Sequence, residues 1–140
     1  MAQTKNDDYI ITSRNLTKVY RMGAEVVHAL RGISVDIPRG EYLSILGPSG
    51  SGKSTFFNLI GGLDMPTSGS VSVDGCNLHE LNQRQLAWMR CHKMGYIFQS
   101  FNLIQTMTAL ENVALPKILA GASPEEARAA AAETLSVVGL

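Results

Sequence analysis

An eight-residue glycine-rich segment constrains this chain more than any other feature of its sequence. Residues 47–54 read GPSGSGKS, which fits the phosphate-binding loop pattern G-x-x-x-x-G-K-[ST]. In such a loop, backbone N–H groups point into a concave space and bind a polyphosphate, and glycines keep that space free of side chains. The lysine reaches the β- and γ-phosphates, and the final hydroxyl binds Mg²⁺. The pattern therefore predicts a nucleotide site that includes Lys53 and Ser54.

The sequence on both sides of this loop supports the same interpretation. Residues 42–46 (YLSIL) have the aromatic, β-branched and aliphatic side chains of a strand. Residues 54–60 contain no helix breaker and carry apolar side chains at helical spacing. A strand, a glycine loop and a helix in this order form the context that the motif needs. The alternative, a Gly/Ser-rich linker that matches the pattern by chance, does not explain these flanks.

Composition narrows the classes of protein that fit. At 140 residues the chain suits one domain with its own core. Twelve Lys and Arg balance twelve Asp and Glu, so no basic surface favours nucleic acid. Cys76 and Cys91 have no metal-type spacing and are expected to be ordinary thiols. No apolar run approaches the ~20 residues that span a bilayer, and the polar start is not a signal peptide. We expect a cytoplasmic chain, held to a membrane only through a partner.

The rest of the sequence predicts a β-rich unit before the loop and mostly helices after it. Strands are expected at 9–20 (broken near 13–15), 26–38, 42–46, 70–74 and 94–99. Helices are expected at 54–60, 81–92, from Thr108 with Pro116 bending or interrupting it, and from Pro124 to about Val138. Capping boxes are predicted at Thr108 and Ser123. The candidates for the buried side of helix 81–92 are Leu81, Leu86, Trp88 and Met89, and residues 1–8 are expected to be disordered.

With these motifs in place, the chain from Tyr20 to Leu140 resembles the first half of an ATP-binding-cassette (ABC) nucleotide-binding domain. Two stretches carry the resemblance: residues 29–75, which contain the glycine loop, and residues 94–113 (MGYIFQSFNLIQTMTALENV). It is similar to the subgroup that drives lipoprotein release and macrolide export. The resemblance implies an α/β fold of the P-loop NTPase type, with an N-terminal antiparallel β subdomain. It implies an ATP-binding core at 1–99 and a partial α-helical subdomain at 100–140.

The resemblance also implies roles for individual residues, with ATP and Mg²⁺ as cofactors. Lys53 and Gln99 would act in catalysis, and Ser54 and Gln99 would bind the metal. The nucleotide-binding residues that it implies are Tyr20, Gly47, Pro48, Ser49, Gly50, Ser51, Gly52, Lys53, Ser54 and Thr55. From the residues alone, Tyr20 would be an ordinary packing residue at a strand end. Gln99 would likewise be only a polar strand end.

Two kinds of partner follow from the resemblance. One is an integral-membrane permease subunit, which would hold the chain at the inner face of the cell membrane, and the other is a second ATP-binding subunit in a homodimer. Three apolar residues in loop 100–107, namely Phe101, Leu103 and Ile104, favour a permease-docking surface. The alternative is that these side chains fold back under the following helix.

Several motifs that the family uses for hydrolysis are absent from the printed sequence. They are the LSGGQ-type signature, an apolar strand that ends in Asp-Glu, and a later switch histidine. The chain thus resembles a truncated domain, expected to be marginally stable and inactive as an isolated ATPase. Two functions from different classes remain open: the energy-coupling subunit of a transporter, and a nucleotide-binding fragment without hydrolysis. A third, a soluble ABC-type ATPase, is disfavoured by the neutral charge and by the export-type sequence around Gln99.

Overall fold

The structure is a computed structural model that describes residues 8–140, and these fall into two units that divide between Leu86 and Ala87. Each unit is described by itself. Apart from Asp8, the residues expected to be disordered lie outside the described part of the chain. Within the described part, no helix is both long and apolar enough to cross a membrane.

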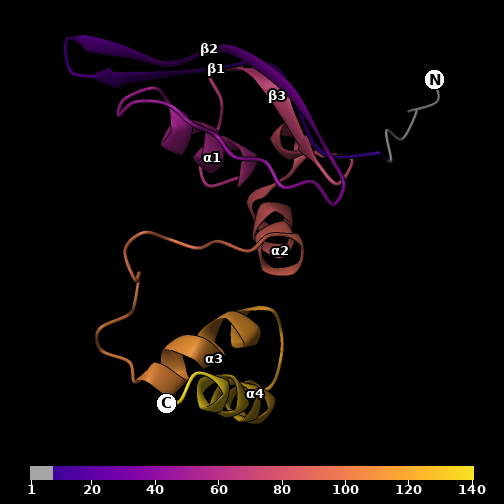
Figure 1. The fold of residues 1–140 in the computed structure, drawn as a ribbon, viewed down its shortest axis with the longest axis vertical. Coiled ribbons are helices and arrows are strands. Elements are labelled where there is room, and N and C mark those ends of the chain that lie inside the picture. The colour runs from indigo at the N-terminus through magenta and orange to yellow at the C-terminus, as the bar shows by residue number, and fades with distance from the viewer. Residues whose placement is uncertain (1–7) are drawn as a thin grey trace. The chain divides into compact units, whose positions relative to one another are not determined.

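The first unit is built on a four-stranded antiparallel sheet (Figure 1). Its strands, in the spatial order β2-β1-β3-β4, are β1 (Tyr9–Met22), β2 (Glu25–Pro38), β3 (Ser68–Val73) and β4 (Cys76–Asn77). A tight turn joins β1 to β2, and Tyr20 pairs with Val27 across this hairpin. The long N-terminal strands predicted from the sequence are therefore confirmed.

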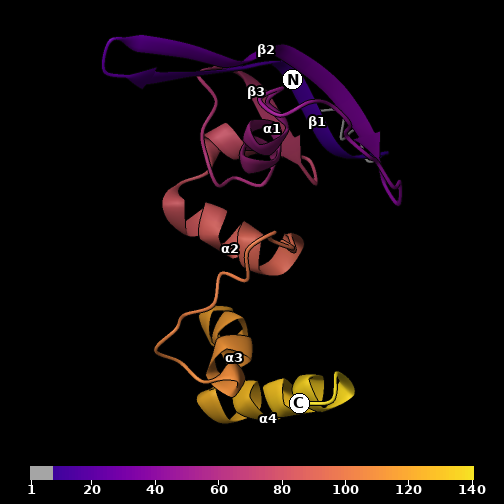
Figure 2. The same cartoon turned by 60° about the vertical axis from the view of Figure 1, so that its left-hand side comes forward.

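One short helix, α1 (Lys53–Ile60), packs on this sheet and contacts β2 and β3. Figures 1 and 2 both show it against one face of the sheet. Phe56 and Leu59 are its buried residues, and Leu16, Leu30 and Val71 are buried in the strands. Burial of these apolar side chains fixes the helix, and with it the glycine loop that precedes it, on the sheet.

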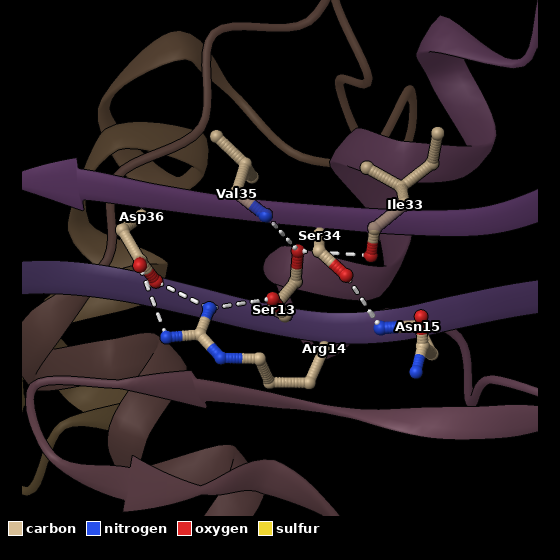
Figure 3. Close-up of polar contacts among 7 residues, drawn as sticks. All are labelled: Ser13, Arg14, Asn15, Ile33, Ser34, Val35 and Asp36. Atoms are coloured by element: carbon tan, nitrogen blue, oxygen red, sulfur yellow. Dashed lines mark hydrogen bonds and ion pairs between the residues drawn. The ribbon is translucent and has the colours of Figure 1, made fainter.

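The predicted break at residues 13–15 is a bulge inside a continuous strand. The β1–β2 register shifts between Ser13 and Leu16, and Asn15 has a φ of 46°. Side chains replace some of the ladder hydrogen bonds there (Figure 3). The Val35 N–H donates to Ser13 Oγ (3.1 Å), which donates to the Ile33 carbonyl (3.3 Å). The Asn15 N–H donates to Ser34 Oγ (2.9 Å).

The remaining helical elements are η1 (Leu78–Glu80), α2 (Gln83–Lys93), α3 (Ala109–Leu119) and α4 (Pro124–Val137). In the second unit, α3 and α4 pack through Ala114, Ala127 and Ala131 with Leu110 beside them. Both predicted capping boxes are confirmed, at Thr108 with Glu111 and at Ser123 with Glu126. Pro116 lies inside α3 and does not interrupt it.

The predictions of strands at residues 42–46 and 94–99 are wrong for the described chain. Neither segment pairs with another strand, since the sheet consists of β1 to β4 alone. A strand exists through its ladder of hydrogen bonds to a neighbour, and strand-like composition cannot replace that neighbour. Tyr42, Leu46 and Ile97 are 93%, 89% and 103% exposed, so these apolar segments also lack a covering surface here.

Trp88 was also misplaced by the sequence pattern. Leu86 and Met89 of α2 are buried as predicted, but Trp88 is 56% exposed and stacks on His92 with ring centroids 4.5 Å apart. Residues three apart share one face of a helix, whereas a residue two positions from Leu86 is turned to the other side. The helical period therefore separates Trp88 from the buried pair.

The bulge predicts that Ser13 contributes to stability through its hydroxyl. Ser13 is fully buried, and Ser13→Ala would leave the Val35 N–H without this acceptor. We expect a loss of about 1–3 kcal/mol in the free energy of unfolding, measured by urea denaturation. Ser34→Ala is the matched control in an exposed position and should cost clearly less. Equal effects of the two substitutions would contradict the role assigned to the buried hydroxyl.

Candidate functional site: a phosphate-loop cavity

The glycine loop enters α1 through two left-handed residues. Gly50 and Gly52 have φ angles of 80° and 92°. This backbone conformation is energetically unfavourable for any residue that carries a Cβ atom. Gly52 is the N-cap of α1, and no side chain among the described residues caps this helix. The first backbone N–H groups of α1 are therefore available to an external acceptor, and the helix dipole favours an anion at this end.

Close packing of the loop requires glycine at position 52, whereas a Cβ atom at position 47 would meet only a hydroxyl that can rotate away. A Cβ atom on Gly52 would lie 2.5 Å from the carbonyl oxygen of Ala29, and one on Gly47 would lie 2.7 Å from Ser51 Oγ. The loop thus approaches the backbone of β2 as closely as a residue without a side chain allows. This contact holds the N-terminus of α1 beside β2.

Lys53 folds back over its own loop. Its Nζ atom donates to the carbonyl oxygens of Gly47 (2.7 Å) and Pro48 (2.8 Å), and it lies 3.3 Å from Ser51 Oγ. The loop therefore presents backbone N–H groups and one ammonium group around the same point. This combination of donors suits a polyphosphate.

A cavity of about 360 Å³ lies in front of the loop. Its lining residues are Tyr20, Val27, His28, Ala29, Ser49, Gly50, Gly52, Lys53, Ser54 and Thr55. The structure thus brings Tyr20, far away in the sequence, to the same cavity as most of the predicted loop residues. The volume falls in the range of small-molecule sites, about 300–1,000 Å³.

Four predicted residues do not line this cavity. Gly47, Pro48 and Ser51 contact Lys53 instead, as described above. Gln99 is exposed and belongs to the second unit, so its role at the site stays a prediction. Among the described residues, no group of three or more His, Cys, Asp or Glu side chains could hold a metal ion.

Sequence reasoning missed the segment of β2 that lines the cavity, Val27, His28 and Ala29. The predicted hairpin could have identified this segment. Strands β1 and β2 were both predicted, and a tight turn between them places the start of β2 directly opposite Tyr20. His28 carries no motif that would have singled it out.

The ring of Tyr20 is held from outside the cavity. Its hydroxyl donates to Asp64 Oδ2 (2.9 Å), and Lys18 Nζ donates to Asp64 Oδ1 (2.6 Å). Partial burial raises the pKa of Asp64, but hydrogen bonds from Lys18, Tyr20 and the Met65 N–H outweigh it and hold the pKa below its ordinary value. Asp64 is therefore a carboxylate at neutral pH and accepts all three hydrogen bonds.

Comparison with known proteins places this chain in a family. The family model described as ABC transporter matches residues 30–140, and the chain belongs to that family. The structure is similar to a solved dimeric structure of the ATP-binding cassette MJ0796 bound to ADP and Pi, with a TM-score of 0.82 and 46% sequence identity. That match covers 93% of this chain and 57% of the other. The α/β fold of ABC ATPases, with its N-terminal antiparallel β subdomain, is thus confirmed.

Named relatives fall in the predicted subgroup. The chain is 48% identical over 131 residues to the macrolide export ATP-binding/permease protein MacB of Mannheimia succiniciproducens. This match covers 94% of the chain and 20% of MacB. It is 40% identical over 134 residues to the lipoprotein-releasing system ATP-binding protein LolD of Legionella pneumophila. This match covers 96% of the chain and 59% of LolD. The chain spans little more than half the length of LolD and MJ0796.

The two left-handed glycines predict different costs for the same substitution. Gly50→Ala and Gly52→Ala both place a Cβ atom on a residue with left-handed backbone. This conformation destabilises the folded chain by about 1–2 kcal/mol. Only Gly52→Ala also drives that atom against the Ala29 carbonyl, since Gly50 has open space around it. We expect Gly52→Ala to lower the urea midpoint further than Gly50→Ala. Equal midpoints would contradict the packing of the loop on β2.

Proposed function

We propose that this chain binds Mg-ATP in the phosphate-loop cavity and is the ATP-binding part of an ABC transporter. In the whole protein, ATP binding and hydrolysis would be coupled to export or lipoprotein release through a membrane permease. One observation carries the nucleotide proposal: Tyr20 and the residues of the glycine loop line a single cavity. An aromatic ring and a polyphosphate-binding loop in one cavity suit the two ends of a nucleotide.

The phosphate end of the nucleotide is assigned to the loop and to Lys53. The uncapped N–H groups of α1 and the left-handed glycines offer backbone donors to the phosphate oxygens. Lys53 would exchange its loop carbonyls for the β- and γ-phosphates, since an ammonium group binds anionic oxygens more strongly than neutral ones. Thr55 lines the same cavity and would lie near the α-phosphate.

The metal proposal rests on Ser54, a hydroxyl residue that lines the cavity. One hard oxygen ligand fits a magnesium ion that takes its other ligands from phosphate and water. When bound, the metal would neutralise charge on the β- and γ-phosphates. Gln99 is proposed to contact the metal and to orient the attacking water, and this role rests on the family resemblance.

Two relatives support the assembly that we propose. The MJ0796 cassette is described as dimeric and bound to ADP and Pi, and MacB is named as an ATP-binding/permease protein. We propose a second ATP-binding subunit and a permease as partners, with the core at residues 1–99 and the partner-facing helical part at 100–140. The protein would then lie at the inner face of the cell membrane.

Lys53→Ala tests the nucleotide proposal. The substitution removes the lysine that lines the candidate phosphate site, and we expect ATP affinity to fall by at least about 30-fold, which corresponds to ~2 kcal/mol. Isothermal titration calorimetry measures the change. Lys117→Ala in α3 is the control for a lysine outside the cavity and should leave the affinity unchanged. Equal ATP affinity in wild type and Lys53→Ala would contradict the proposal.

The permease proposal predicts a contact at loop 100–107. Phe101, Leu103 and Ile104 are 91%, 61% and 41% exposed, so the apolar side chains are accessible to a partner. A cysteine placed at Leu103, in a variant whose own cysteines are replaced, should cross-link to a co-expressed permease. A cysteine at Thr134, exposed on α4, is the control position. A functional complex that gives no adduct at Leu103 would count against docking at this loop.

A further inference from the structure

We propose that Asp64 and Lys18 position the Tyr20 ring so that one of its faces is presented to the nucleotide base. This inference rests on the nucleotide site proposed above and adds two positioning residues to it. Both act through Tyr20, because neither lines the cavity.

The contacts fix the ring at two points. The Tyr20 hydroxyl is tied to Asp64 Oδ2, and Lys18 Nζ lies 4.9 Å from the centroid of the ring. A tyrosine can otherwise rotate about its two side-chain torsions. A hydrogen bond at the far end of the ring and a cation close to its π-surface together restrict that rotation. The ring is therefore held in place before any ligand binds.

Lys18 also decides which face of the ring is available. Lys18 and Tyr20 are two residues apart on β1, and both side chains contact Asp64. The side chain of Lys18 is 12% exposed, and its ammonium group donates to Asp64 Oδ1 (2.6 Å) and the Met65 carbonyl (2.6 Å). Because the ammonium group occupies one face, a stacking base must use the other.

Asp64 connects this arrangement to the phosphate loop through α1. The N–H groups of Leu63 and Asp64 both donate to the Asn58 carbonyl, at 2.8 and 3.2 Å. The carboxylate is therefore anchored just after the C-terminal end of α1, and the helix begins at Lys53 in the loop. The N-terminal end of this short helix thus holds the phosphate donors, and the turn after its C-terminal end holds Tyr20 through Asp64. This explains how a residue of the β1–β2 hairpin keeps a fixed position relative to the loop.

A structural role alone would also account for the ion pair, which ties β1 to the turn after α1. The two roles differ in what they do to ligands. A positioning role affects only ligands that carry a base, whereas loss of structure affects every ligand of the cavity. Inorganic triphosphate reaches the loop without a base and is the matched probe for ATP.

The experiment measures calorimetric affinities of the full chain for ATP and for inorganic triphosphate. Asp64→Ala and Tyr20→Phe should each weaken ATP binding by roughly tenfold, the effect of one charge-assisted hydrogen bond, and leave triphosphate binding unchanged. Asp64→Asn keeps an oxygen acceptor for the Tyr20 hydroxyl and should retain more ATP affinity than Asp64→Ala. Tyr20→Phe keeps the ring and the Lys18 ion pair, so it tests the idea even if Asp64→Ala does not fold.

Asp36→Ala is the control for loss of an ion pair in the same sheet. Asp36 pairs with Arg14 between β1 and β2, outside the cavity (Figure 3), and both affinities should stay at wild-type values. A parallel loss of ATP and triphosphate binding in Asp64→Ala, or unchanged ATP binding in Asp64→Ala and Tyr20→Phe, would overturn the positioning role. A wild-type chain that binds neither ligand would instead overturn the nucleotide site itself.

Discussion

The candidate site depends on the close contact between the glycine loop and β2. Gly52 lies so near the Ala29 carbonyl that no side chain fits between them, and its left-handed backbone turns the chain directly into α1. The first N–H groups of the helix have no side-chain cap, and its first three residues line the cavity.

The same helix connects the two halves of the candidate site. Its N-terminus forms part of the phosphate loop, its apolar side packs on the sheet through Phe56 and Leu59, and Asp64 follows its C-terminus. The hydrophobic contacts are not specific for a ligand, but they fix the geometry on which the polar contacts depend. The candidate site is therefore supported by the core of the first unit.

The sequence alone predicted those features of the structure that depend on residues close together in the chain. The glycine pattern predicted the loop and the start of α1, and the Ser/Thr-x-x-Glu pattern predicted both capping boxes, because each feature depends on residues only a few positions apart. It failed for residues 42–46 and 94–99, whose strand character needs a neighbouring strand that the described chain does not supply. It could not find Asp64 either, since a contact with Tyr20 across 44 positions leaves no local pattern.

The most direct test of the account is to map where a polyphosphate binds, residue by residue. Titration of the ¹⁵N-labelled chain with inorganic triphosphate, followed by NMR, reports on each backbone N–H group. If the glycine loop is the phosphate site, the largest amide shifts occur at Gly50, Gly52, Lys53, Ser54 and Thr55, with small shifts in α3 and α4. Shifts that are absent from the loop, or that are largest in the second unit, would contradict the assignment of the glycine loop as the phosphate site.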